Sequence, residues 1–206
     1  MARIGILGGT FNPPHLGHLV CAQEAHAALN LDRVVLMPAA ATPHKAVPGD
    51  PGAEVRLELC RLATARDERL AVSRVELDRP GRSYTVDTLA ALRSAHPEDE
   101  LTFIVGGDMA ASLPSWRDPG RVLSLAGFAV AERAGEGAGR EEILDALDTF
   151  PGAAERLEFF TMPRIDISST EIRRRVAQGR PIRYLVTDDV ADLIGARGLY
   201  GGAVRE

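Results

Sequence analysis

The sequence has few of the residues that stabilise small proteins through disulfides or structural metals. It contains two cysteines, Cys21 and Cys60, which lie far apart and form no C-x-x-C pair. This spacing excludes a zinc knuckle and a thioredoxin-type redox pair. We expect both thiols to be small buried side chains in a protein from a reducing compartment.

Long hydrophobic runs are also missing. No apolar segment approaches the roughly 20 residues that a membrane-spanning helix requires. The N-terminal segment MARIGILGG has only a short apolar stretch before its glycines, without the longer apolar core and cleavage site of a signal peptide. We therefore expect a cytoplasmic protein with no membrane partner.

An excess of positive charge is lacking as well. The formal net charge is -5 and the sequence pI is about 5.6, which argues against a broad basic surface for a nucleic acid and leaves room for a local anion site. The 206 residues, 45% of them hydrophobic, suffice for one core, so we expect a single domain over residues 1–206. Nothing in the sequence indicates the oligomeric state.

Short apolar segments of strand length alternate with segments of helical spacing. Strands are predicted at 4–7, 34–37, 101–105 and 128–131, with weaker candidates at 70–75 and 157–160. Helices are predicted at 16–29, 53–65, 86–95, 143–147 and 187–199. The alternation predicts a doubly wound α/β fold: a Rossmann-like parallel sheet of five or six strands, helices on both faces and a small C-terminal helical part.

The stretch GGTFNPPHLGH, residues 8–18, follows the first predicted strand, at the sheet edge where open α/β folds bind ligands. Gly8 and Gly9 let the chain turn and let a ligand approach main-chain N–H groups. Two prolines can then open a helix near His15, which would place His15 and His18 on one face at an anion-favouring helix N-terminus. The residues alone leave two interpretations open, a phosphate site and a turn with a packed histidine; a metal site lacks further ligands.

A second segment, ISSTEIRRR at residues 167–175, has the spacing of a capping box and predicts a helix with Ser168 as N-cap. The amides and hydroxyls of Ser169 and Thr170 would lie at the positive end of that helix and could bind a polyphosphate. Successive helical residues turn by roughly 100°, so three consecutive arginines cannot face one phosphate. We expect Arg173 to face it.

A third segment, GGDMAASLPSW, follows the predicted strand at 101–105 and so reaches the same sheet edge. Gly106 permits close backbone approach, and Asp108 could either accept from ribose hydroxyls or cap a helix. Trp116 is the single tryptophan. It is either part of the core or a stacking platform for a ring.

Together these segments resemble the HxGH nucleotidyltransferase superfamily, which has the signatures HxGH and ISSTxIR. The longer block GGTFNPPHxGH is most similar to the bacterial nicotinate mononucleotide adenylyltransferases. The resemblance runs from Gly5 to about Tyr200 in matching order. It implies an enzyme of NAD biosynthesis that transfers AMP from ATP to nicotinate mononucleotide, giving nicotinate adenine dinucleotide (deamido-NAD) and pyrophosphate.

The resemblance also implies roles for individual residues. Catalysis would rest on His15, His18 and Arg173. ATP would contact Gly8, Gly9, Thr10, Phe11, Gly106, Asp108, Ser168, Ser169 and Thr170. Nicotinate mononucleotide and the phosphates would contact His44, Lys45, Thr85 and Trp116. Mg²⁺ would be held mainly by substrate phosphates, with no metal site formed by the protein.

Two alternatives are weighed against this function. Another member of the superfamily could adenylylate nicotinamide mononucleotide or phosphopantetheine, although LPSW and SYTVDTL fit the phosphopantetheine enzymes less well. A nucleotide sensor without turnover is the second alternative. Both histidines together with an intact ISSTEIR argue against a sensor, because binding alone needs no donors for a transition state.

Overall fold

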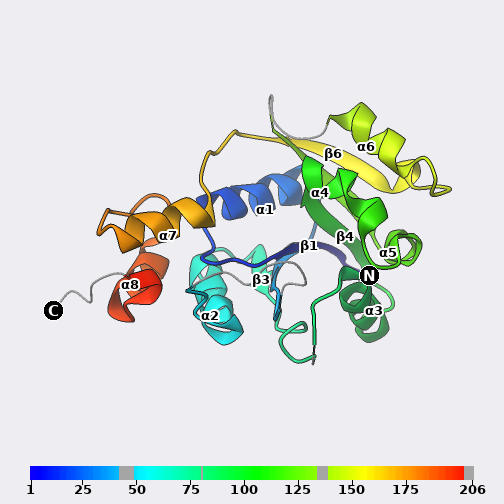
Figure 1. Ribbon diagram of the computed structural model, residues 1–206. Coiled ribbons are helices and arrows are strands. Elements are labelled where there is room, and N and C mark those ends of the chain that lie inside the picture. The colour runs from blue at the N-terminus through cyan, green and yellow to red at the C-terminus, as the bar shows by residue number, and fades with distance from the viewer. Residues whose placement is uncertain (42–48, 80, 134–138, 202–206) are drawn as a thin grey trace.

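The computed structural model describes residues 1–41, 49–79, 81–133 and 139–201. Within these ranges six strands form one parallel sheet in the order β3-β2-β1-β4-β5-β6 (Figure 1). The strands are β1 (Arg3–Gly9), β2 (Arg33–Pro38), β3 (Leu70–Val72), β4 (Glu100–Gly106), β5 (Gly127–Arg133) and β6 (Leu157–Met162). This order confirms the doubly wound Rossmann-like sheet and places its switch point between β1 and β4.

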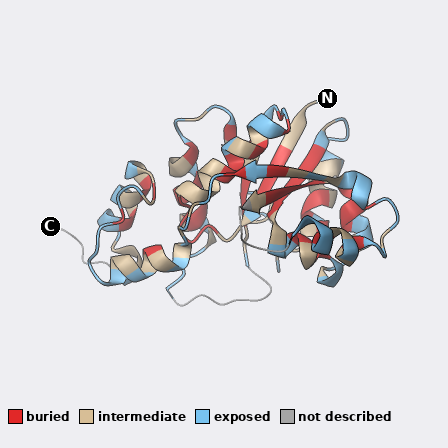
Figure 2. Cartoon of the chain, turned by 90° about the horizontal axis from the view of Figure 1, so that it is seen from above, coloured by how far each residue is buried: buried red, intermediate tan, exposed pale blue. Residues whose placement is uncertain are grey.

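Helices lie on both faces of the sheet (Figure 1). They are α1 (Leu16–Ala28), α2 (Ala53–Thr64), α3 (Thr85–Ala95), α4 (Gly107–Ala111), α5 (Pro119–Leu125), α6 (Arg140–Leu147), α7 (Ser169–Ala177) and α8 (Asp188–Ala196). Strand residues alternate between two buried clusters: Ile6 and Phe103 pack toward α3–α6, whereas Leu7 and Ile104 pack toward α1. Figure 2 shows buried residues concentrated along the strands and the inner helix faces.

Several predicted boundaries were wrong by a few residues. The strand predicted at 70–75 ends at Val72, and the helix predicted from residue 143 begins at Arg140. Sequence periodicity also missed α4 and α5, which have five and seven residues. Such short helices span at most two turns and leave little periodic signal.

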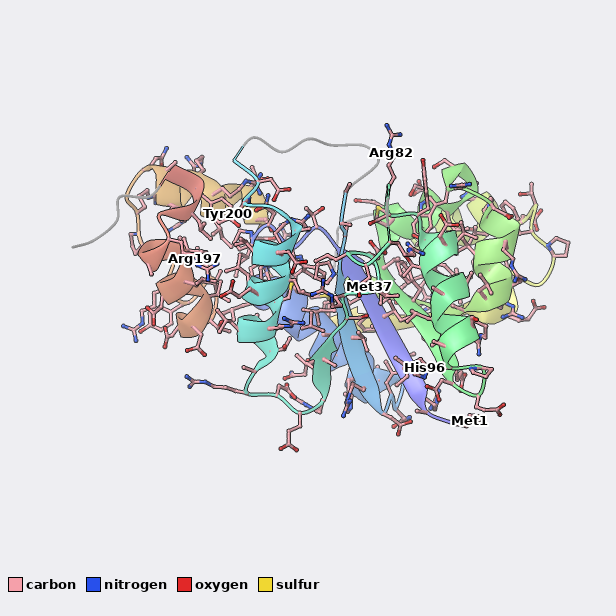
Figure 3. The ribbon with its side chains drawn as sticks, turned by 90° about the horizontal axis from the view of Figure 1, so that it is seen from below. Met1, Met37, Arg82, His96, Arg197 and Tyr200 are labelled. Atoms are coloured by element: carbon pink, nitrogen blue, oxygen red, sulfur yellow. The ribbon has the colours of Figure 1, made fainter. Side chains whose placement is uncertain are left out.

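The C-terminal helices pack on α2 rather than on the sheet. Leu59 of α2 forms a separate buried cluster with Ile172 of α7 and Val190 of α8. At its surface, Arg197 donates to both carboxylate oxygens of Glu58 at 2.8 and 2.7 Å. Figure 3 shows Arg197 and Tyr200 on this segment beside α2. The predicted C-terminal helical part is therefore present, and α7 is held close to the carboxyl edge of β1.

Both cysteines are buried, as expected, and the structure joins neither of them in a disulfide. Burial raises the pKa of the Cys60 thiol, and the nearby Arg56 only partly offsets this. Among the described residues, no helix is both long and apolar enough to cross a bilayer.

Candidate active site

The chain leaves β1 through a buried loop, residues 10–15, whose carbonyls are bound by side chains from other elements. Arg56 on α2 donates through Nη1 to the Thr10 oxygen at 2.9 Å. Two α7 residues complete the set: Arg173 Nη1 donates to the Asn12 oxygen at 2.7 Å, and Ser169 Oγ donates to the Pro13 oxygen at 2.8 Å. The loop is thus fixed by two helices that are distant from it in sequence.

The geometry of the two histidines differs from the prediction. The helix begins at Leu16, so His15 is the N-cap residue with an extended backbone, and the prolines precede the helix instead of opening it. The two rings nevertheless lie together, stacked with centroids 3.7 Å apart. His15 and His18 therefore present imidazoles side by side, although they do not share a helix face.

The His-x-x-His spacing has a local structural reason. His18 is the third residue of α1, and its Nδ1 accepts the main-chain N–H of His15 at 3.2 Å, as the third residue of a capping box does. Because Nδ1 is the acceptor, a neutral His18 ring carries its proton on Nε2. The cap thereby sets the tautomer of His18 and makes Nε2 the donor of the ring.

Two neighbours hold the histidine rings. The Phe11 ring meets the His18 ring edge-on, with centroids 4.9 Å apart. Gly17 lies directly beneath His15, because a Cβ added at Gly17 would stand 3.1 Å from His15 Nδ1. The glycine of HLGH thus makes room for the first imidazole.

The N-terminus of α7 forms the second wall of the site. Ser168 is the N-cap and its Oγ accepts the Glu171 N–H at 3.1 Å, as predicted. The main-chain N–H groups of Ser169 and Thr170 have no hydrogen-bond partner among the described residues. These two amides are positioned to bind an anion at a helix N-terminus.

The three arginines of α7 point in different directions. Arg173 turns to the β1 loop, whereas Arg174 and Arg175 both donate to the Glu171 carboxylate. Hydrogen bonding from Arg174 is the main cause that lowers the pKa of Glu171. The sequence argument for Arg173 thus agrees with the geometry, although its contact with a phosphate stays a prediction.

The carboxyl end of β4 supplies a third wall. Gly106 ends the strand and is the N-cap of α4, and the exposed Asp108 lies in the first turn of that helix. Trp116 is half-buried: its indole N–H donates to Ser112 Oγ at 3.1 Å, and its ring lies edge-on to Phe103 at 6.0 Å. A second ring, Phe128, lies 6.3 Å from the indole, so three contacts hold the indole in place.

The residues next to Thr85 and Trp116 contact each other. The guanidinium carbon of Arg117 lies 4.7 Å from the ring centroid of Tyr84, the residue before Thr85. Thr85 is the first residue of α3, whose N-terminus has no side-chain cap. Arg117 also pairs with Asp87 in the first turn of α3, at 3.6 Å. The N-terminus of α3 is thus joined to the segment that follows Trp116.

Two predicted residues, His44 and Lys45, lie outside the described ranges. One residue was missed: Arg56, which is 2% exposed and contacts the loop directly. A charged residue on the apolar side of a predicted helix is a signal that could have identified it, because arginine is seldom fully buried without partners.

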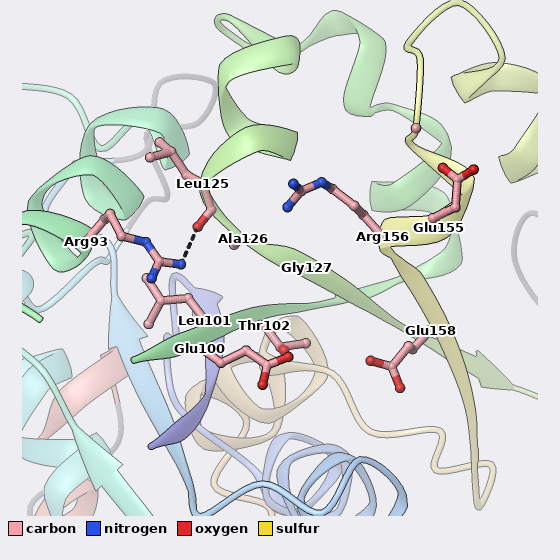
Figure 4. Close-up of a pocket in the computed structure, with 11 residues that line it drawn as sticks. Arg93, Glu100, Leu101, Thr102, Leu125, Ala126, Gly127, Glu155, Arg156 and Glu158 are labelled. Carbon is pink, nitrogen blue, oxygen red and sulfur yellow. Dashed lines mark hydrogen bonds between the residues drawn. The ribbon is translucent and has the colours of Figure 1, made fainter. Parts of the chain in front are cut away.

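A cavity of about 540 Å³ lies elsewhere, at the amino ends of β4, β5 and β6 (Figure 4). Its wall includes Arg93, whose guanidinium already donates to the Leu125 oxygen at 2.9 Å. None of the predicted site residues lines it. It opens at the sheet edge opposite the loop after β1, so it is not part of this site.

Comparisons with known proteins agree with this geometry. Residues 6–175 match the model of the cytidylyltransferase-like family. The chain is 48% identical to a protein of Roseiflexus sp. (strain RS-1) over 97% of this chain and 98% of that one, and 45% identical to one of Thermus thermophilus over 96% and 99%. Both are named probable nicotinate-nucleotide adenylyltransferases.

The chain belongs to the nicotinate-nucleotide adenylyltransferase family.

The fold of this family is shared by a solved structure. A Plasmodium falciparum nicotinic acid mononucleotide adenylyltransferase complexed with NaAD superposes with a TM-score of 0.80 over the full length of both chains, at 18% identity. At that identity the likeness shows the fold alone. The three walls around the β1 loop lie at the switch point of the sheet, which is where this fold binds ligands.

Proposed function

We propose that this chain transfers the adenylyl group of ATP to nicotinate mononucleotide, giving deamido-NAD and pyrophosphate. One observation carries the proposal: Arg173 and Ser169 of α7 bind the loop that presents His15 and His18. This contact joins a helix N-terminus suited to a polyphosphate with two imidazoles. The names of close relatives support the same reaction.

The reaction requires one displacement at the α phosphorus. An oxygen of the nicotinate mononucleotide phosphate bonds to that phosphorus, and the bond from it to the bridging oxygen of the β phosphate breaks. The attacking phosphate has a second pKa near 6, so at pH 7 it is largely ionised and needs no general base. The protein's task is to align two anions and to neutralise the charge that develops.

The hydrogen-bond donors of the site fall into groups that would contact different parts of the two substrates. His15 and His18, at the end of β1, would contact the α phosphate and its developing charge. The free amides of Ser169 and Thr170, together with Arg173, would bind the leaving pyrophosphate. Thr85 and Trp116 would hold the nicotinate carboxylate and ring. His44 and Lys45 are assigned to the phosphates from the resemblance alone.

ATP would enter as its Mg²⁺ complex. The groups around the loop are imidazoles, main-chain N–H groups and a guanidinium, which are donors suited to phosphate oxygens. We assign the Mg²⁺ to the substrate phosphates and water. Its chemistry would be to neutralise phosphate charge.

A turnover assay tests the reaction. The purified chain is incubated with ATP, Mg²⁺ and either nicotinate or nicotinamide mononucleotide, and pyrophosphate and dinucleotide are both measured. We expect faster turnover with the nicotinate substrate, because uncapped amides at the α3 N-terminus favour a carboxylate. No dinucleotide with either substrate would refute the reaction, and equal rates would refute the preference.

A further inference from the structure

The residue Phe11 adopts a backbone conformation that costs energy unless its surroundings hold it. Its φ of 49° lies in the left-handed region, which a bulky side chain rarely occupies. The carbonyls on either side of it are both bound by arginines, Thr10 by Arg56 and Asn12 by Arg173. Strained residues persist when several contacts determine their geometry, as they do here.

Arg56 uses every nitrogen of its guanidinium for a different segment. Nε donates to Asp50 Oδ1 at 3.1 Å, Nη1 to the Thr10 oxygen at 2.9 Å, and Nη2 to the Ala40 oxygen at 3.2 Å. Thr10 follows β1 and Ala40 follows β2, so one side chain fixes the exits of two adjacent strands relative to each other. A lysine at this position has one nitrogen and cannot reproduce the fork.

The contact with Thr10 also determines where the next N–H points. In a planar trans peptide, the C=O of Thr10 and the N–H of Phe11 point to opposite sides. The Phe11 N–H therefore points away from Arg56, and it has no hydrogen-bond partner among the described residues although Phe11 is only 2% exposed. A buried N–H without a partner is costly, which makes it a candidate donor to a ligand.

We propose that Arg56 is a positioning residue that aims the Phe11 N–H at the phosphate at which AMP is transferred. The inference rests on the proposed function and adds to it a residue that touches no substrate. Arg56 acts through the peptide between Thr10 and Phe11, while Arg173 holds the other side of the same residue. Without the three hydrogen bonds of Arg56 this peptide could rotate, and the Phe11 N–H would no longer point at the phosphate.

The direct test is Arg56→Lys, compared with Arg61→Lys at an exposed position on the same helix. We expect kcat of Arg56→Lys to fall on the order of 10²-fold, as a misplacement of about 1 Å costs, with KM for nicotinate mononucleotide unchanged. Arg61→Lys should match the parent. A purely structural role predicts a lower melting temperature with kcat per folded molecule unchanged, and that result would overturn the proposal.

A milder variant covers the case in which Arg56→Lys does not fold. Asp50 is partly exposed and accepts from the guanidinium only through Nε, besides the Gly52 N–H at 3.0 Å. Asp50→Ala therefore frees the guanidinium to rotate without emptying a buried site. We expect a smaller fall in kcat, about 5-fold, again with KM for nicotinate mononucleotide unchanged. Parent-like kcat in this variant, with Arg56→Lys unfolded, would count against the proposal.

A binding measurement separates this inference from the proposed reaction. In the parent labelled with ¹⁵N-phenylalanine, the Mg²⁺ complex of α,β-methylene-ATP should shift the Phe11 amide proton downfield, and Arg56→Lys or Asp50→Ala should reduce that shift. If the Phe11 amide proton of the parent does not shift, the Phe11 N–H does not bind the phosphate and the proposal is wrong. Loss of dinucleotide synthesis in the parent, with the shift retained, would instead refute the reaction.

Discussion

The substitution His18→Ala has two consequences, one for catalysis and one for stability, and the structure predicts each of them separately. The Nε2–H of His18 would be lost as a donor to the developing charge on the α phosphate. Removing one such donor costs about 3 kcal/mol, or a fall in kcat of about 10²- to 10³-fold. The same change removes Nδ1, which accepts the His15 N–H at 3.2 Å.

That second loss is a cost in stability. Losing a hydrogen bond of this kind lowers the free energy of unfolding by about 1 kcal/mol. In a chain of this length that corresponds to a fall in melting temperature of about 2–4 °C. We therefore expect His18→Ala to remain folded at 25 °C while losing nearly all turnover. Steady-state kinetics and thermal unfolding measure the two effects separately.

His18→Asn is the matched control. Its Oδ1 occupies the place of Nδ1 and can accept the His15 N–H, whereas nothing occupies the place of Nε2. We expect the melting temperature to return toward that of the parent while kcat stays about 10²-fold lower. If His18→Asn recovers turnover together with stability, His18 serves only as a cap and the catalytic assignment is wrong.

Three further predictions concern the packing of the site. Gly17→Ala puts a Cβ 3.1 Å from His15 Nδ1, so kcat should fall about 10-fold with little change in melting temperature; parent-like kinetics would contradict the tight packing. Trp116→Leu removes an indole held by Ser112 and Phe103, so KM for nicotinate mononucleotide should rise about 10-fold and KM for ATP should not; a change in KM for ATP alone would contradict the assignment. Cys60 is fully buried and its raised pKa keeps it a thiol, so a disulfide reagent at pH 8 should label it only after unfolding, and rapid labelling of the native chain would contradict the packing.

Sequence reasoning predicted the sheet well because its buried strands are short apolar runs with clear boundaries. The parallel order follows from the alternation of those runs with helices. The small helices α4 and α5 were missed because five and seven residues span at most two turns and leave little periodic signal. The start of α5 does have a local signal, since the Asp118 side chain accepts the Arg121 N–H just before the helix.

The candidate site was predicted in part. The motifs identified which segments meet, and the capping box placed the start of α7 correctly. Sequence spacing failed for His15, because whether a residue caps a helix or belongs to it depends on the backbone angle that follows Pro14. Arg56 was missed because two of its three partners are main-chain carbonyls, which no residue type encodes. Its one signal in the sequence is a charged side chain on the apolar side of a predicted helix.

The most direct test of the central claim follows oxygen atoms through the reaction. Nicotinate mononucleotide carrying ¹⁸O in its phosphate is incubated with ATP, Mg²⁺ and the purified chain, and the products are analysed by mass spectrometry and ³¹P NMR. Attack at the α phosphorus places ¹⁸O in the bridge of deamido-NAD and leaves the released pyrophosphate unlabelled. Label in the pyrophosphate, or a dinucleotide with no ¹⁸O in its bridge, would contradict the account.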